Sequence, residues 1–256
     1  MNRKSLLYFI IARHGTKNLK RATYYHQQRP LPRMVVVLLI GFLVMLGCSE
    51  KSSSDPAQQP PTDPARTYAG TIVAMGDSLT AGLRVSEEDA YPAQLARRLK
   101  ADGYNYRVVN AGVSGETSSG AWSRIDWVLE SLKPDIVILE TGANDGLRGL
   151  DPELIQANLD RLVGLMRERD IEVVLAGMRM LPNLGPVYTQ AFSQIYPRIA
   201  EKHNIILIPF FLEGVAGRDS LNQADKLHPT ADGYTRIVDT IYPYLIKAIE
   251  RRSTGK

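Results

Sequence analysis

Ser78, Asp225 and His228 are residues whose types and order fit nucleophilic catalysis. A serine hydroxyl is a weak nucleophile at neutral pH, so it needs a base to take its proton. His228 can be that base, and Asp225, three residues earlier, can accept the imidazole Nδ1–H. That bond fixes the tautomer and stabilises the imidazolium that forms during the reaction. The sequence therefore predicts a catalytic triad in the chain order Ser78, Asp225, His228.

The tetrahedral intermediate of such a reaction carries an oxyanion that needs hydrogen-bond donors. The backbone N–H groups of Ser78 and Gly115 and the side-chain amide of Asn144 can supply three donors. Each such donor is worth roughly 10²–10³ in rate in measured oxyanion holes. The sequence holds no His or Cys cluster with metal-ligand spacing and no glycine-rich phosphate loop. We therefore expect a hydrolase that uses no metal and no cofactor.

The elements that must position these residues are predicted strands. Apolar runs at 71–75, 106–110 and 136–141 end directly before the segments that carry Ser78, Gly115 and Asn144. Two further strands are expected at 171–176 and 205–209. Because the carboxyl ends of parallel strands meet at one edge of a sheet, these segments are expected to lie together there.

Helical patterns alternate with the strands and cover 89–100, 117–132, 151–169, 188–202 and 229–249. The third begins with Asp151 as cap and Pro152 in the first turn, and its predicted inward face includes Leu154 and Ile155. Alternating strands and helices of this length indicate a parallel sheet with helices on both faces. We expect an α/β fold of three layers in a single domain over 69–250, with 251–256 as a flexible tail.

Four short motifs together resemble the SGNH, or GDSL, hydrolase superfamily. They are Gly-Asp-Ser-Leu at 76–79, Asn-Ala-Gly-Val-Ser-Gly at 110–115, Gly-Ala-Asn-Asp at 142–145 and Asp-Lys-Leu-His-Pro at 225–229. Within the resemblance, which spans about 69–248, segments 143–150 and 191–197 are similar to the bacterial multifunctional thioesterase/lysophospholipase/arylesterase group. The resemblance implies a flavodoxin-like five-stranded sheet. Thr80 stands where the G-x-S-x-G elbow of α/β-hydrolases has its second glycine, which weighs against that fold.

The first 68 residues differ in composition from the predicted domain. Residues 34–46 are apolar and uncharged and follow Arg33, which is typical of an export signal. The signal is expected to cover 1–48 and to end in a lipobox-like Leu-Gly-Cys, with Cys48 as lipid acceptor and Met45 as an imperfect match. A plain signal peptide or an uncleaved anchor remains the alternative, and the long segment 1–33 leaves open a translation start after Met1. Residues 49–68 are expected to be a Pro/Ser-rich tether.

We therefore expect the protein to be exported and anchored to a membrane, facing the periplasm or the cell surface. Eight basic and no acidic residues lie in 1–33, so the net charge of +4 becomes −4 for the remainder. The negative net charge of residues 34–256 gives no reason to expect nucleic-acid binding. We expect the protein to be a monomer.

Substrate preference rests on apolar residues in loops at the predicted active edge. Leu147, Leu181, Leu184 and Tyr188 could form an acyl-binding surface, although ordinary packing under the loops explains them equally well. The leading interpretation is a serine esterase of arylesterase or lysophospholipase type, with thioesters in its range. The alternatives are an O-deacetylase acting on cell-envelope or other polysaccharides, and a non-catalytic binding lipoprotein.

Overall fold

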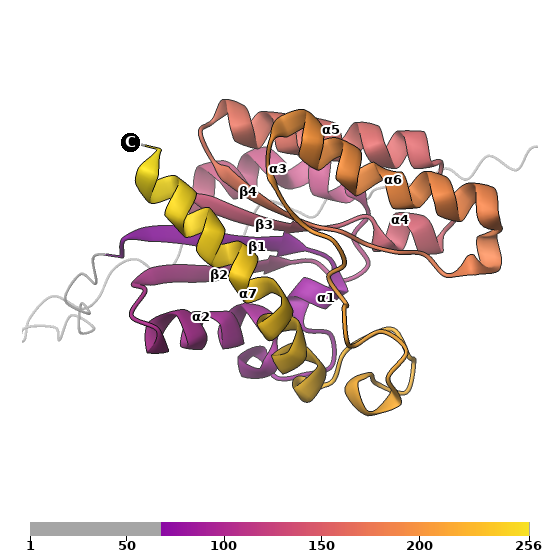
Figure 1. The fold of residues 1–256 in the computed structure, drawn as a ribbon, viewed down its shortest axis with the longest axis horizontal. Helices are drawn as coiled ribbons and strands as arrows, with labels where there is room; N and C mark the ends of the chain where they lie inside the picture. The colour runs from indigo at the N-terminus through magenta and orange to yellow at the C-terminus, as the bar shows by residue number, and fades with distance from the viewer. Residues whose placement is uncertain (1–67, 256) are drawn as a thin grey trace, which may run out of the picture. The chain divides into compact units, whose positions relative to one another are not determined.

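Five apolar runs form one parallel sheet in the computed structural model, which describes residues 68–255 (Figure 1). The strands are β1 (Gly70–Gly76), β2 (Tyr106–Gly112), β3 (Ile136–Glu140), β4 (Glu172–Ala176) and β5 (Ile206–Ile208). They pair in the order β2-β1-β3-β4-β5, and every neighbouring pair is parallel. Every residue of β3 and β4 is buried, as expected for strands covered on both faces. The predicted α/β fold is confirmed.

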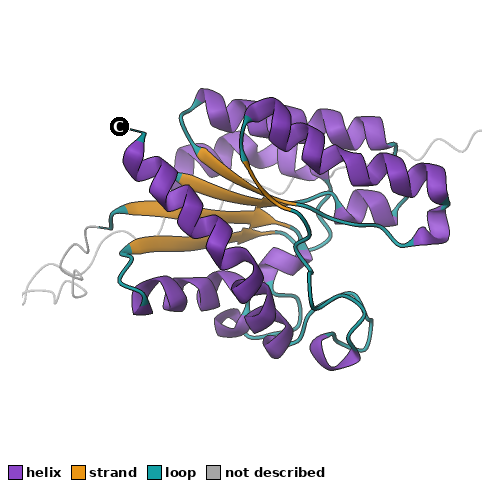
Figure 2. Cartoon of the chain, viewed as in Figure 1, coloured by secondary structure: helices purple, strands orange, loops and turns teal. Residues whose placement is uncertain are grey.

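Helices cover both faces of the sheet (Figures 1 and 2). One face carries α2 (Tyr91–Ala101) and α7 (Ala231–Thr254), which pack against each other. The other face carries α3 (Ser118–Leu132), α5 (Pro152–Glu168) and α6 (Pro186–His203). Short helices α1 (Ser78–Ala81) and α4 (Ala143–Leu147) follow β1 and β3 directly, and single 3₁₀ turns form η1 (Glu87–Asp89), η2 (Pro182–Leu184) and η3 (Asp219–Leu221).

The start of α5 shows how the sequence sets an element. The Asp151 side chain accepts the Glu153 N–H at 2.9 Å and Pro152 occupies the first turn, as predicted. Ile155 is fully buried, but Leu154 is 46% exposed, so its predicted inward position is wrong. Leu154 lies in the first turn, about 100° around the helix from Ile155, where the helix face has already left the core.

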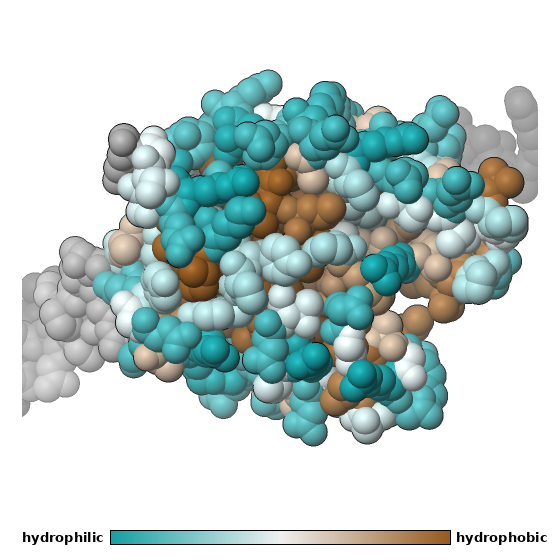
Figure 3. Space-filling view, in the orientation of Figure 1, coloured by the Kyte–Doolittle hydropathy of each residue, from teal (hydrophilic) through white to brown (hydrophobic). Residues whose placement is uncertain are grey.

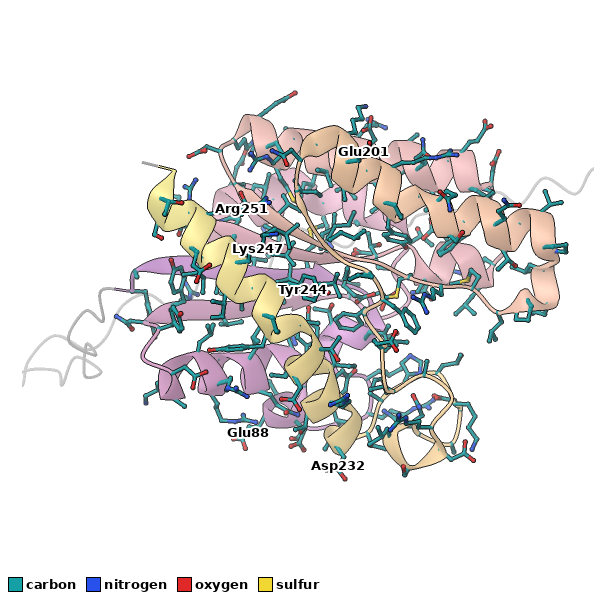
Figure 4. All side chains as sticks on the ribbon, viewed as in Figure 1. Glu88, Glu201, Asp232, Tyr244, Lys247 and Arg251 are labelled. Carbon is teal, nitrogen blue, oxygen red and sulfur yellow. The ribbon has the colours of Figure 1, made fainter. Side chains whose placement is uncertain are left out.

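The carboxyl end of the chain is also more ordered than predicted. Helix α7 continues to Thr254, so residues 251–254 are helical and not part of a flexible tail. Arg251 approaches the Glu172 carboxylate at 3.4 Å, and Arg252 donates to Asp170 at 2.7 Å. Figure 4 labels Tyr244, Lys247 and Arg251 along this part of the helix. These contacts to the start of β4 hold the last turns of α7.

The export signal, Cys48 and the tether up to residue 67 lie outside the described residues. Among residues 68–255, no helix combines the length and the apolarity needed to cross a membrane.

Candidate active site

Ser78 is the first residue of α1, directly after the tight connection from β1 at Asp77. Asp77 caps α1, and its Oδ1 accepts the Leu79 N–H at 2.9 Å. Gly76 leaves the room for this turn, because an added Cβ would collide with the Thr80 hydroxyl and the Glu140 carboxyl. The result is a serine held at the carboxyl end of β1, 8% exposed.

The structure brings His228 and Asp225 to this serine across 150 residues of sequence. Ser78 Oγ lies 2.8 Å from His228 Nε2, and His228 Nδ1 lies 2.9 Å from Asp225 Oδ2. Asp225 Oδ1 accepts the backbone N–H groups of Leu227 and His228, each at 3.0 Å. These arrangements can carry a proton from the hydroxyl to the imidazole while a carboxylate holds the ring.

The electrostatics of Asp225 suit that task. The His228 backbone N–H, followed by the Leu227 N–H and the imidazole, holds the pKa of the Asp225 carboxyl well below its usual range. The carboxylate is therefore ionised at every pH at which the protein would work. Its charge can stabilise an imidazolium throughout that range.

The loop that carries the two residues is fixed from both sides. Gln223 Nε2 donates to the backbone oxygens of Leu83 and Pro229, at 2.8 and 2.9 Å. Arg84 donates to Asp225 Oδ2 at 2.9 Å and has a positive φ of 62°, an uncommon backbone conformation for a side chain of this kind. Sequence reasoning missed Arg84, since nothing in its surroundings marks a contact to a residue 141 positions later.

Gly115 follows β2 with a positive φ of 79°, the region that favours glycine. An added Cβ there would meet nothing within 4 Å, so the space beside it is open. Its carbonyl accepts from Arg148 at 3.0 Å. The N–H groups of Ser78 and Gly115 have no acceptor within residues 68–255, which leaves both available to a ligand oxygen.

Asn144 is near the same turn, but its amide is occupied. Its Nδ2 donates to Asp77 Oδ2 at 2.9 Å and to the Glu116 carbonyl at 3.0 Å. Arg124 in turn holds the Glu116 carboxylate at 2.6 and 2.7 Å. One of the two Asn144 bonds must open before the amide can donate to an oxyanion, and the structure shows it instead as a link between two segments of the site.

Beneath the serine lies a second carboxyl that sequence reasoning also missed. Glu140, the last residue of β3, is fully buried, and its Oε2 accepts the Thr80 hydroxyl at 2.8 Å. Burial, and next the Asp77 carboxylate, raises the pKa of Glu140 well above its usual value. Burial also raises the pKa of Asp77 itself. The signal available in the sequence was a lone acidic residue closing a wholly apolar run.

The predicted acyl-binding residues lie on neighbouring elements at one end of the molecule. Leu147 on α4, Leu181 before η2 and Leu184 in η2 are 50%, 59% and 38% exposed. Tyr188 differs from them, because its hydroxyl donates to the Leu150 carbonyl at 2.8 Å and its ring stacks on Phe192. In Figure 3 the visible face is mostly hydrophilic, with hydrophobic side chains in the middle of the face, beside α7, and at the end where α4 and the start of α6 lie.

Among residues 68–255, no three His, Cys, Asp or Glu side chains are grouped to hold a metal ion. Residues 68–255 thus offer a nucleophile, a base, an orienting carboxylate and free N–H donors.

Comparisons with known proteins point to the same chemistry. The model of the GDSL-like lipase/acylhydrolase family matches residues 74–236. Esterase TesA of Pseudomonas aeruginosa is 41% identical over 177 residues, which cover 69% of this chain and 88% of that protein. An arylesterase of Vibrio mimicus is 35% identical over 69% of this chain and 88% of its own length.

Solved structures agree with the fold. The crystal structure of TesA superposes with a TM-score of 0.67 at 40% identity, covering 70% of this chain and 99% of that one. The esterase EstA from Pseudoalteromonas sp., described as inhibited by monoethylphosphonate, gives 0.68 at 35% identity and covers 71% of this chain and 99% of its own.

Proposed function

The chain belongs to the GDSL-like lipase/acylhydrolase family, and we propose that it is a serine esterase that hydrolyses carboxylic esters through an acyl-enzyme on Ser78. One observation carries the assignment of roles. Ser78 Oγ, His228 and Asp225 form a continuous line of hydrogen bonds of 2.8 and 2.9 Å between segments 150 residues apart. Residues that served only as turns or helix caps would not be expected to form this line of hydrogen bonds.

In the first half of the reaction, Ser78 Oγ attacks the ester carbonyl carbon while its proton passes to His228 Nε2. The carbonyl oxygen gains the negative charge and accepts from the free N–H groups of Ser78 and Gly115. Asn144 adds a third donor when it releases Asp77 or Glu116. The intermediate then collapses, and His228 gives its proton to the departing alcohol or thiol.

In the second half, water takes the place of the alcohol. His228 accepts a proton from the water as its oxygen attacks the acyl carbon, and the same donors hold the second oxyanion. Collapse breaks the bond to Ser78 Oγ, which regains its proton from His228. The acid leaves and the site returns to its starting state.

The full-length protein should therefore hydrolyse p-nitrophenyl butyrate, and Ser78→Ala should abolish turnover. Ser123→Ala is a matched control, because that serine lies exposed on α3 with its hydroxyl on the Gly120 carbonyl. His228→Gln should be inactive, whereas His203→Gln should not, since His203 pairs with Asp160 on another part of the surface. Normal turnover by Ser78→Ala would refute the assignment.

For the substrate class we propose esters with an apolar acyl or aryl part, including aryl esters and lysophospholipids. Exposed Leu147, Leu181 and Leu184 favour this class, since they offer an apolar acyl chain a surface that an acetylated sugar would not use. A series of acyl-chain lengths on aryl esters and lysophospholipids, run beside acetylated sugars, tests it. Preferred turnover of the sugars would favour the deacetylase instead.

We also propose that the protein is exported and anchored through a lipid on Cys48. The lipobox-like segment and the absence of any other cysteine support this. Cells fed radiolabelled palmitate should label the protein, and Cys48→Ser should lose both the label and the membrane association. Equal labelling of the two would refute the anchor.

A further inference from the structure

Glu140 contacts residues 77–80, here called the nucleophile turn, on both sides of Ser78. Its register partner in the sheet is Gly76, and its Oε2 accepts the Asp77 N–H at 3.2 Å and the Thr80 hydroxyl at 2.8 Å. The missing Cβ of Gly76 is what lets this carboxyl lie under the turn. A single buried side chain therefore holds the residue before the nucleophile and the residue two positions after it.

The surroundings of Glu140 disfavour a negative charge. No ion pair within residues 68–255 includes it, and its Oε1 has no hydrogen-bond partner there. The titratable groups that face it are Asp77 from the turn, Tyr91 from α2, Tyr196 from α6 and Tyr234 from α7. All four are neutral or negative, so none can compensate a buried carboxylate.

Asp77 is better placed than Glu140 to keep the charge of the pair. Its two oxygens accept from the Leu79 N–H and from Asn144 Nδ2, both at 2.9 Å. Burial and the neighbouring Asp77 carboxylate raise the pKa of Glu140 well above its usual value, which agrees with this division. The pair thus shares one negative charge, and that charge resides on Asp77.

We propose that Glu140 is a positioning residue of the hydrolase, acting as a neutral carboxylic acid that holds the 77–80 turn and so aims Ser78. This rests on the esterase function proposed above. A second negative charge on Glu140 would repel Asp77, whose carboxylate carries the links to Leu79 and Asn144. Loss of the Glu140 proton at high pH therefore misplaces Ser78 and the oxyanion donors, and turnover falls.

The kinetic test compares full-length wild type, Glu140→Gln and Glu140→Ala on p-nitrophenyl butyrate over a range of pH, after subtraction of spontaneous hydrolysis. Glu140→Ala should lose about 10² in kcat, the cost of misplacing reacting groups by about an ångström. Glu140→Gln, which copies the shape of the neutral acid, should exceed Glu140→Ala by at least about tenfold. The alkaline decline of wild type should be absent from Glu140→Gln.

Glu172→Gln is the matched control, because Glu172 is a buried carboxylate at the far end of the sheet and pairs with Arg167 and Arg251. Its pH profile should match that of wild type. A Glu140→Gln enzyme as poor as Glu140→Ala, or one that keeps the alkaline decline, would overturn the proposal.

An infrared measurement separates this proposal from the esterase assignment. At neutral pH the folded wild type should show the carbonyl stretch of a protonated carboxylic acid, and the band should vanish in Glu140→Gln but persist in Glu172→Gln and Ser78→Ala. Identical spectra for wild type and Glu140→Gln would mean that Glu140 is ionised and would refute its neutral role, whatever the turnover of the enzyme.

Discussion

Asp225→Asn should lower turnover because it changes which nitrogen of His228 carries the proton, and not because packing is lost. In the structure Asp225 Oδ1 accepts two backbone N–H groups, at 3.0 Å each, while Oδ2 faces His228 Nδ1 and Arg84, at 2.9 Å each. An amide in this place keeps its oxygen on the two backbone donors and turns its NH₂ toward the imidazole. Nδ1 must then lose its proton and Nε2 must carry one, so Nε2 cannot accept the proton of Ser78.

The expected loss in kcat/KM is about 10⁴-fold, the loss that the same change of tautomer causes in a serine protease, or about 5 kcal/mol of transition-state stabilisation. Asp225→Ala should lose less, because the Asp225 side chain is 27% exposed and water can enter to accept the Nδ1–H. The carboxylate stays ionised from acidic to alkaline pH, so a change of pH should not mask the difference.

Initial rates on p-nitrophenyl butyrate from pH 5 to 9 measure both variants. Asp219→Asn serves as the control, since that aspartate lies 80% exposed in the preceding turn and pairs with Lys226. If Asp225→Asn kept more than about a tenth of wild-type activity, or if Asp225→Ala were the worse of the two, the proton on His228 would not be the cause of the loss.

Three further predictions test other parts of the account. Gly115→Ala should cost about 1–2 kcal/mol in the free energy of unfolding, because alanine tolerates the φ of 79° poorly; an unchanged urea midpoint would contradict this. Glu140→Gln should gain stability relative to wild type as pH rises above 4.5, by up to about 1.4 kcal/mol per pH unit. The reason is that the pKa of Glu140 is raised in the folded state, so above pH 4.5 the unfolded wild-type chain loses this proton while the folded protein keeps it, and the free energy of unfolding falls. Stability curves in urea that stay parallel for the two proteins would refute this. Leu181→Ser should lower kcat/KM for octanoyl esters more than for acetyl esters, and an equal loss for both would remove Leu181 from the acyl surface.

The sheet and the meeting of distant segments could be predicted because both follow from local pattern. Apolar runs such as 136–140 specify strands, and a parallel arrangement must bring the strand ends to one edge. The segments that carry Ser78 and Asn144 therefore meet without any knowledge of side-chain contacts. Leu154 shows the limit of the same method, because a helical pattern does not say where a helix face leaves the core.

What could not be predicted depends on contacts in three dimensions. Glu140 reads in sequence as the polar end of a strand, and only the fold shows it under the nucleophile turn. From the sequence, Asn144 is expected to be a free hydrogen-bond donor, but in the structure both protons of its amide are already donated. Arg84 joins the site through an unusual backbone conformation that its residue type does not reveal.

The most direct test of the central claim is to trap the acyl-enzyme. Wild type mixed with p-nitrophenyl butyrate, quenched in acid within the first turnovers and digested, should yield a peptide with one butyryl group on Ser78. His203→Gln should give the same peptide, and Ser78→Ala should give none. A butyryl group on any other residue, or full turnover by Ser78→Ala, would contradict the account.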